Sequence, residues 1–491
     1  NGNIAIVHNG IIENYNELKS MLKDHKFNSE TDSEIIAHLI EHYNKNYSYI
    51  ESVKKALNKI KGSYALLILN NHNNILIAAK KSSSLVLGFD NNDIFAASDV
   101  NAFISNTNKA YFMEDGEIAV IDKGVKLFDN RGKEKKIEIK TVSVKDKNIS
   151  KQGFAHFMLK EIFEQKYCLN KTLKQNKEEV LKVSKLINGY KNIILTGCGT
   201  AYHACLTSSY IFSKVRKKHV STIQASEIIN FKDILNKDTL IIAISQSGET
   251  ADLLDAIKIG KEKKCKVLSI VNVEESTLAR LSDKSLFINV GPEIAVASTK
   301  AFTGQVVLLM LLAYSSINKY YEGVKILNSI IKKINLIINK DLLNRVEQIS
   351  KKIKQQNLFV LGKNLNYPIA LESSLKIKEV SYIHAEGFAG SELKHGTLAL
   401  IDKGTPCIVL CSKDDNDIIN NAAEVKARGG TIIAISPFNH NIFDYFIQVP
   451  ESDFQALINL IPAQLLAYYL SINRNLNPDK PKNLAKSVTV K

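Results

Sequence analysis

The sequence lacks any apolar run long enough to cross a membrane. Its longest uninterrupted apolar stretch is Val306–Tyr314, whereas a membrane-spanning helix needs about 18 or more such residues. No stretch near the first residue has the pattern of a signal peptide. We therefore expect no membrane association and a cytoplasmic location.

Cysteine is sparse, and its pattern excludes two kinds of site. The six cysteines are scattered, with no CxxC pair and no Cys/His cluster: Cys168, Cys198, Cys205, Cys265, Cys407 and Cys411. Disulfide frameworks and structural zinc sites are built on such clusters. We expect reduced thiols, and no motif calls for a metal or an organic cofactor.

Arginine is also scarce, since only six of the 65 basic residues are Arg. A net charge of +15 is compatible with a nucleic acid, an acidic membrane or a phosphorylated substrate as partner. The lysines are spread along the chain, however. Arginine forks and alternating aromatic and basic residues, which are typical of nucleic-acid binding, are not found. We expect a mainly solvated lysine surface and no nucleic-acid partner.

Length and composition indicate a globular protein with several domains. The 491 residues are 45% hydrophobic and 23% charged, and at roughly 100–200 residues per domain they predict about three domains. Residues 1–145 read as α+β, with helices predicted at 32–44 and 50–60. Short strands are predicted at Ile4–Val7, Tyr64–Leu69, Ile75–Ala79, Ile94–Ala97 and Ile118–Ile121. Residues 146–175 are expected to form a linker, and helical periodicity runs from about 156 to 188.

An internal repeat follows the linker. Residues 192–197, 240–244 and 261–271 match residues 357–362, 405–409 and 426–436, all with an offset of 165. A later pair, 311–314 and 465–468, has an offset of 154, so the second copy has lost about eleven residues in between. Each copy alternates apolar strands with amphipathic helices, which predicts two doubly wound parallel sheets. We place the two domains at 176–325 and 340–475, followed by a tail at 476–491.

Ligands of parallel sheets bind at the carboxyl ends of the strands, and two loops there carry polar donors. Ser245-Gln-Ser-Gly-Glu-Thr250 opens a predicted helix, where backbone N–H groups and the helix dipole favour an anion. Helix capping alone needs fewer donors, so we expect a phosphate site formed by Ser245, Gln246, Ser247 and Thr250. Thr200, after the first strand, is a further donor. The second copy has Asp414 and Asp415 at this place, which would repel a phosphate.

The second copy contributes a helix with three charges on one face. Glu372, Lys376 and Glu379 are spaced i, i+4 and i+7. They form either an exposed salt-bridged face or an acid/base cluster beside a substrate. His395 follows in a polar loop and could act near neutral pH or be merely exposed. Lys486 lies in a tail that is either frayed or folded over a site, where its amine could form a Schiff base.

Taken together, these motifs resemble the glutamine–fructose-6-phosphate aminotransferase (isomerising) family. The resemblance rests on Ser245–Thr250, Val296–Thr303, Glu392–Gly396 and Leu484–Val490, and in the first domain on His8–Asn14 and Ser29–Asp32. It implies an N-terminal-nucleophile glutaminase domain followed by two sugar-isomerase (SIS) domains. The implied substrates are glutamine and fructose 6-phosphate, and the implied product is glucosamine 6-phosphate.

The resemblance also assigns roles. Lys486 would form the Schiff base, Glu379 would move a proton between carbons 1 and 2, and Glu372 and Lys376 would assist it. His395 would open the sugar ring from a second subunit, which implies a homodimer. The residues implied to hold the sugar phosphate are Thr200, Ser245, Gln246, Ser247, Thr250, Val296, Ser298 and Ala485.

In the glutaminase domain, the resemblance implies that Asn9 and Gly10 form the oxyanion hole and that Asp32 holds the glutamine amino group. The family's cysteine nucleophile precedes this motif by roughly a hundred residues, whereas here the motif begins at His8. We therefore expect this sequence to be incomplete at its N-terminus and to lack glutaminase activity as written. Two alternatives are a plain sugar-phosphate isomerase and a non-catalytic sugar-phosphate sensor.

Overall fold

The computed structural model describes residues 2–71, 74–91, 93–142, 150–413 and 415–489. By its internal contacts the chain divides into two compact units. The first unit comprises 1–147, 249–252 and 488–491, and the second comprises 148–248 and 253–487.

In its described residues the first unit contains two antiparallel sheets and three α-helices. One sheet has the order β1-β2-β3-β7-β8-β9 and the other β10-β6-β4-β5. The helices are α1 (Tyr15–Met21), α2 (Ser33–Asn44) and α3 (Tyr49–Lys59). The strands are β1 (Ile4–Ile12), β2 (Gly62–Asn70), β3 (Ile75–Lys81), β4 (Val86–Phe89), β5 (Ile94–Ala97), β6 (Lys109–Phe112), β7 (Ile118–Ile121), β8 (Val125–Phe128), β9 (Glu134–Lys135) and β10 (Lys140–Thr141).

Strand alternation explains how this unit is layered. On β2, Leu66 and Ile68 share a core with Ile36 of α2 and Val53 of α3, while Ala65 belongs to a second core that also includes residues of β4 and β6. The predicted helices and strands are confirmed to within a few residues. The first strand is longer than predicted, because residues 8–12 continue the ladder by pairing with residues 62–66 of β2.

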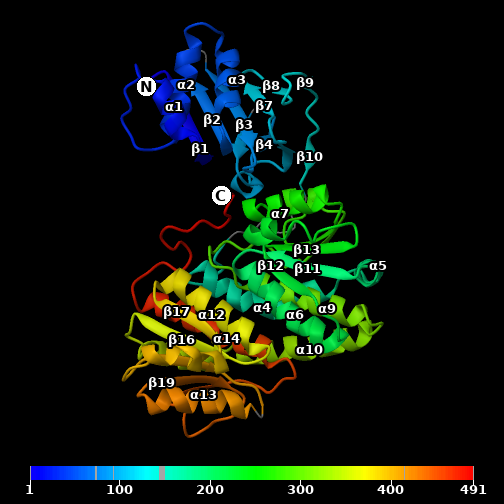
Figure 1. Cartoon of the computed structure of the whole chain (residues 1–491), viewed down its shortest axis with the longest axis vertical. Coiled ribbons are helices and arrows are strands. Elements are labelled where there is room, and N and C mark those ends of the chain that lie inside the picture. Colours follow the sequence, from blue (N-terminus) through cyan, green and yellow to red (C-terminus); the bar gives the residue numbers. More distant parts are fainter. Residues whose placement is uncertain (1, 72–73, 92, 143–149, 414, 490–491) are drawn as a thin grey trace. The chain divides into compact units, whose positions relative to one another are not determined.

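The second unit contains the two parallel sheets that the repeat predicted. Their orders are β12-β11-β13-β14-β15 and β17-β16-β18-β19-β20, and the yellow strands β16 and β17 and the orange strand β19 of Figure 1 belong to the second of them. The first sheet comprises β11 (Asn192–Gly197), β12 (Ser221–Gln224), β13 (Thr239–Ser245), β14 (Lys266–Val271) and β15 (Lys284–Phe287). The second comprises β16 (Asn357–Gly362), β17 (His384–Ala389), β18 (Pro406–Leu410), β19 (Thr431–Ser436) and β20 (Tyr445–Gln448). β11 and β14 match β16 and β19 at the predicted offset of 165.

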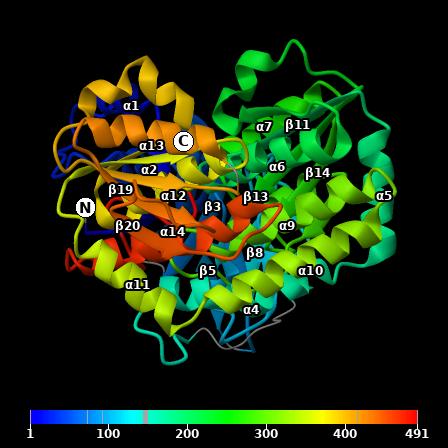
Figure 2. The same ribbon diagram turned by 90° about the horizontal axis from the view of Figure 1, so that it is seen from below.

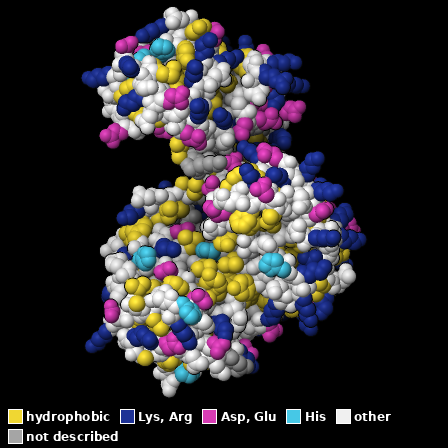
Figure 3. Space-filling view, viewed as in Figure 1, with side chains coloured by type: hydrophobic (Ala, Val, Ile, Leu, Met, Phe, Trp, Pro, Cys, Tyr) yellow, Lys and Arg dark blue, Asp and Glu magenta, His cyan; other side chains and the backbone are white. Residues whose placement is uncertain are grey.

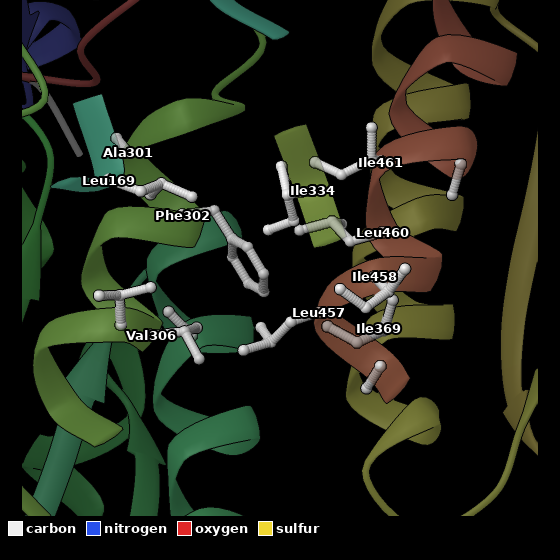
Figure 4. Close-up of a cluster of buried hydrophobic side chains, with 14 of the residues drawn as sticks. Leu169, Ala301, Phe302, Val306, Ile334, Ile369, Leu457, Ile458, Leu460 and Ile461 are labelled. Carbon is white, nitrogen blue, oxygen red and sulfur yellow. The ribbon is translucent and has the colours of Figure 1, made fainter. Parts of the chain in front are cut away.

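Helices cover both sheets and join their cores. They are α4 (Phe157–Leu173), α5 (Lys177–Asn188), α6 (Thr200–Arg216), α7 (Ala251–Glu262), α8 (Thr277–Leu281), α9 (Lys300–Ser315), α10 (Tyr320–Ile337), α11 (Lys340–Ser350), α12 (Asn366–Ser381), α13 (Asn416–Ala427) and α14 (Gln455–Ile472). In Figure 2, α6, α9, α12 and α14 lie in the middle of the second unit. Figure 4 shows Phe302 and Val306 of α9 facing Leu457 and Leu460 of α14 across one apolar core. The two repeats therefore pack into a single body.

Helix α14 is long and apolar enough to span a membrane, but 89% of it is buried inside the protein. A search for uninterrupted apolar stretches does not find this helix, because polar residues interrupt its apolar sequence. Those polar residues are paired in the core: Asn459 donates to the backbone oxygen of Cys411 over 2.9 Å. Such pairing is typical of the core helix of a globular protein.

Most of the expected linker 146–175 is instead part of this body. Residues 157–173 form α4, and Met158, Ile162 and Leu169 are buried in the shared core. This segment is part of the core, and not a linker, because the apolar face of α4 packs against α9. Residues 143–149 lie outside the described part of the chain. The amino end of α4 is capped by Asp479, whose carboxylate accepts hydrogen bonds from the backbone nitrogens of Phe157 and Met158 (2.9 and 2.8 Å).

Charged side chains of both signs are mixed on the surface. Figure 3 shows Lys and Arg side chains dispersed over the visible face, with Asp and Glu between them. Dispersed charges of both signs are typical of a solvated surface rather than of a nucleic-acid groove.

Candidate active site in the second unit

The loop after β13 has the form of an anion site. Ser245 and Ser247 are buried, at 3% and 8% exposure, and the hydroxyl oxygen of Ser245 accepts a hydrogen bond from the backbone nitrogen of Gly248 (2.9 Å). Gly248 has φ +71°, and an added Cβ would lie 2.2 Å from Oγ of Ser276. Only glycine fits this turn.

Thr250 and Thr200, which were also predicted to bind the phosphate, do not lie in the loop of Ser245 and Ser247. Thr250, half-buried before α7, is grouped with the first unit. Thr200 begins α6, and its hydroxyl donates to Oε1 of Glu372 (3.0 Å) and accepts from Nζ of Lys376 (2.8 Å). Thr200 thus belongs to the charged cluster on α12.

The second repeat has no equivalent anion loop in its described part. Asp415 accepts a hydrogen bond from the backbone nitrogen of Ile418 (3.3 Å) and so caps its own helix, α13. A carboxylate therefore already occupies that helix end. Asp414 lies outside the described residues.

The α12 face is buried, which excludes the alternative of an exposed salt-bridged face. Glu372 is 0% and Lys376 is 1% exposed. Nζ of Lys376 lies 3.5 Å from Oε1 of Glu372 and donates to Oε2 of Glu379 over 2.5 Å. Across the interface between repeats, Nδ1 of His203 lies 2.8 Å from Oε2 of Glu372. An ion pair and two hydrogen bonds thus connect the four charged or titratable side chains.

The electrostatics keep Lys376 charged. Burial alone would lower its pKa, but attraction to Glu372 and then Glu379 outweighs burial and raises the pKa above its usual value. Glu293 also contributes to this rise, so the α12 cluster and Glu293 lie within electrostatic reach of each other. Glu379 is the partly accessible end of the cluster, with its side chain 21% exposed. It is therefore placed to exchange a proton with a bound molecule.

Lys486 is held against a buried carboxylate. Its Nζ donates to Oε2 of Glu293 and to the backbone oxygen of Ala295, both over 2.8 Å. Glu293 also accepts from Ser298 Oγ (2.8 Å), Thr299 N (2.9 Å) and Ala301 N (3.0 Å). Burial works against its ionisation, but Lys486 and these donors lower the pKa of Glu293 to about 2.

The other predicted sugar-contacting residues surround this ion pair. Ser298 contacts Glu293 directly, and the backbone nitrogen of Val296 donates to the backbone oxygen of Asp479 (3.1 Å). Ala485 precedes Lys486 and is exposed. The tail at 476–487 is thus folded onto the second unit, which excludes the alternative of a frayed tail for these residues.

Three residues of this region were not predicted from the sequence: His203, Glu293 and Glu161. Glu161 of α4 is 1% exposed, and its Oε1 accepts from the backbone nitrogens of Ile294 (2.5 Å) and Ala295 (3.2 Å). Burial, and then repulsion from Glu293, raise the pKa of Glu161 to about 8. The sequence contained one indication of Glu293: it lies in the stretch that is about eleven residues longer in the first repeat than in the second.

His395 lies apart from both clusters. It is exposed at the end of a 3₁₀ turn, Gly390–His395, and within the described residues no hydrogen bond or ion pair joins it to the α12 cluster or to Lys486. A role for His395 in this site therefore requires another molecule or a movement of its loop.

The predicted glutaminase residues lie together in the first unit. Gly10 pairs with Tyr64 on β2, and an added Cβ would lie 2.1 Å from the backbone oxygen of Ser63. The carboxylate of Asp32 accepts from the backbone nitrogen of Ile12 (2.7 Å), which ties it to the same strand. Asn9 is exposed, and its amide donates to Oγ1 of Thr489 (3.1 Å).

Comparisons with known proteins find relatives of both units. The SIS domain family matches residues 186–315 and 353–474, and the glutamine amidotransferase domain family matches residues 1–105. The C-terminal domain of glucosamine-fructose-6-phosphate aminotransferase from Francisella tularensis superposes with TM-score 0.62 at 34% identity, covering 67% of this chain and 100% of that one. Glucosamine-6-phosphate deaminase from Thermotoga maritima has TM-score 0.56 at 28% identity, covering 68% of this chain and all of that one.

Full-length relatives carry one name. The glutamine–fructose-6-phosphate aminotransferase (isomerizing) of Thermococcus kodakarensis is 40% identical over 100% of this chain and 85% of its own length. That of Clostridium tetani is 39% identical with the same coverage. The chain therefore belongs to the glutamine–fructose-6-phosphate aminotransferase (isomerizing) family.

Proposed function

We propose that this protein makes glucosamine 6-phosphate from fructose 6-phosphate, with glutamine as the source of ammonia. The observation that carries the proposal is the pairing of Lys486 with buried Glu293, within electrostatic reach of the Glu372–Lys376–Glu379 cluster. A primary amine for covalent chemistry and a carboxylate for proton transfer are the two groups that the reaction requires.

The steps follow from these groups. The loop at 245–248 binds the phosphate through its hydroxyl and backbone donors. The Lys486 amine attacks carbon 2 of open-chain fructose 6-phosphate and water leaves, which gives a Schiff base. Ammonia then replaces the lysine at carbon 2. Glu379 removes a proton from carbon 1 of this imine and delivers it to carbon 2, while the hydroxyl proton on carbon 1 passes to the nitrogen. Carbon 1 thereby becomes the aldehyde, and carbon 2 carries the amine.

Lys376 and Glu372 have supporting roles in this proposal. Lys376 donates to Glu379 and holds its carboxylate in place, and Glu372 is fixed between Lys376, Thr200 and His203. Asn9, Gly10 and Asp32 are proposed as the oxyanion hole and the amino-group anchor for glutamine.

The direct test incubates the protein with fructose 6-phosphate and ammonium and detects glucosamine 6-phosphate by mass spectrometry. Borohydride should trap the hexose phosphate on Lys486. Lys486→Arg should abolish both signals, because a guanidinium does not form this Schiff base. Lys480→Arg, in an exposed lysine of the same tail, is the matched control and should retain both.

Two outcomes separate the alternatives. A nitrogen-free hexose phosphate as the product, with no amino sugar, would favour a plain isomerase. Binding of fructose 6-phosphate without any product, unchanged by Lys486→Arg, would favour a sensor.

We further propose a cytoplasmic homodimer in which His395 completes the site of the other subunit. The support is the exposed position of His395, away from the groups it would serve. Mixing the inactive variants His395→Ala and Lys486→Arg under exchange conditions should restore part of the activity, since some hybrid sites receive both native residues. Absence of any recovery between exchanging dimers would contradict the sharing of His395.

A further inference from the structure

A cluster of two histidines and a glutamate in the first unit lies outside the catalytic machinery. Nδ1 of His25 is 3.2 Å from Nδ1 of His38, and each of these atoms is 3.5 Å from Oε2 of Glu41. The side chains of His25 and His38 are 9% and 8% exposed, whereas Glu41 is 37% exposed. Three potential ligand atoms thus converge on one point that solvent reaches from the side of Glu41.

The dimensions of this triangle match a tetrahedral metal site. Zinc binds histidine nitrogen at about 2.0–2.1 Å and carboxylate oxygen at about 2.0–2.2 Å, so two ligands of a tetrahedral ion lie about 3.4 Å apart. The three edges of 3.2, 3.5 and 3.5 Å are close to that value. Two histidines and one glutamate form a known zinc ligand set that leaves a fourth position open.

The surroundings of His38 also fit a metal ligand. Its other ring nitrogen, Nε2, lies 3.4 Å from Oε1 of Glu34. Histidine ligands commonly donate this second N–H to a carboxylate, which fixes the ring and its tautomer. Glu34 is itself held by the backbone nitrogens of Asn28 and Ser29, both over 2.7 Å. The orienting carboxylate is therefore fixed in place.

A proton alone satisfies this arrangement poorly. One N–H shared by His25 and His38 leaves the lone pair of one Nδ1 facing the Glu41 carboxylate, whereas a cation accepts electron density from all three atoms. His42 and Lys45 lie near His25 and influence it electrostatically. When charged, both oppose a cation, so the affinity depends on the three ligands outweighing them.

We propose that His25, His38 and Glu41 bind one Zn²⁺ ion, with water as the fourth ligand. His25 lies in the connection between α1 and α2, and the other two ligands lie on α2. The ion ties this connection to the middle of α2. Because Asp32 belongs to the same connection, the ion also braces the residue proposed to hold glutamine. The site does not depend on the proposed reaction.

The test titrates the full chain, first stripped with a chelator, with ZnCl₂ in a calorimeter and then with Co²⁺ in a spectrophotometer. We expect one Zn²⁺ per chain and the visible spectrum of tetrahedral Co²⁺ with nitrogen and oxygen ligands. His25→Gln and Glu41→Gln should abolish this binding. Glu34→Gln should weaken it about 10–100-fold, as is usual for loss of an orienting partner.

His42→Gln is the matched control, because it removes a neighbouring imidazole on the same helix but none of the three ligands; its binding should stay intact. Unchanged Zn²⁺ binding in Glu41→Gln, or no stoichiometric binding by the native chain, would overturn the proposal and leave a histidine–histidine hydrogen bond. Glu41 is partly exposed, so its variant is decisive even if His25→Gln folds poorly. A cobalt spectrum with thiolate bands would place the ion on cysteine and likewise overturn the site.

Discussion

Glu161 offers a sharp test of the electrostatics around Lys486. Its pKa of about 8 means that this buried side chain carries a proton at pH 7 in the folded protein, while an unfolded glutamate with a pKa near 4.5 is ionised. Folding is therefore coupled to the uptake of a proton. Each pH unit above 4.5 lowers the free energy of unfolding by about 1.4 kcal/mol. At pH 7 the cost is about 3 kcal/mol.

Glu161→Gln should remove that cost. Glutamine has the shape of a protonated glutamate, and its carbonyl oxygen can still accept from the backbone nitrogens of Ile294 and Ala295. We expect the variant to be about as stable as the native protein at pH 4.5 and about 3 kcal/mol more stable at pH 7. The gain should stop growing near pH 8, where native Glu161 begins to ionise.

Urea unfolding followed by circular dichroism between pH 4.5 and 8.5 measures this difference. Glu293→Gln is the control at the same site and should act in the opposite direction. Its carboxylate, with a pKa of about 2, contributes stability above pH 4.5 that is lost as the pH falls toward 2, and breaking such a buried pair costs about 3–5 kcal/mol. A Glu161→Gln variant that is less stable at pH 7, or whose stability difference does not change with pH, would refute the reasoning.

Three further predictions concern neighbouring parts of the site. Lys376→Met should lower the free energy of unfolding by about 3–5 kcal/mol, because it leaves Glu372 buried without its cation; the urea midpoint at pH 7 measures it. Gly248→Ala should weaken binding of fructose 6-phosphate by about tenfold or more, because φ +71° and the contact with Ser276 force the loop to move; calorimetric titration measures it. Glu379→Gln should reduce amino-sugar formation by about 10²–10⁴-fold while borohydride trapping on Lys486 persists, and loss of trapping would argue against its role in proton transfer.

The repeat made the second unit predictable. A constant offset fixes the order of strands and helices in both copies, and the loops at strand ends follow from that order. The spacing of Glu372, Lys376 and Glu379 placed them on one face of a helix, but it did not show whether that face is exposed to solvent or buried in the core. That choice depends on Thr200 and His203, which lie about 170 residues earlier and contact Glu372 only once the two repeats pack together.

Irregular segments were harder to predict. Glu293 lies in a loop without periodicity. Its partner Lys486 follows 193 residues later, and the neighbouring Glu161 lies on α4. His25 and His38 are separated by 13 residues and match no metal-binding spacing. Residues 157–173 have helical periodicity, but the polar residues among them suggested a linker. The structure shows instead that the apolar face of α4 packs against α9. In each case the deciding contact is distant in sequence.

The distance between Glu293 and Lys486 also has a consequence for synthesis of the protein. Lys486 is added 193 residues after Glu293, which takes about 10–40 s at 5–20 residues per second. Throughout that interval the first sugar-isomerase domain can form its sheet, but its loop around Glu293 lacks the ion pair with Lys486. Until then the carboxylate relies on its donors Ser298, Thr299 and Ala301, and the ion pair with Lys486 closes the loop late in synthesis.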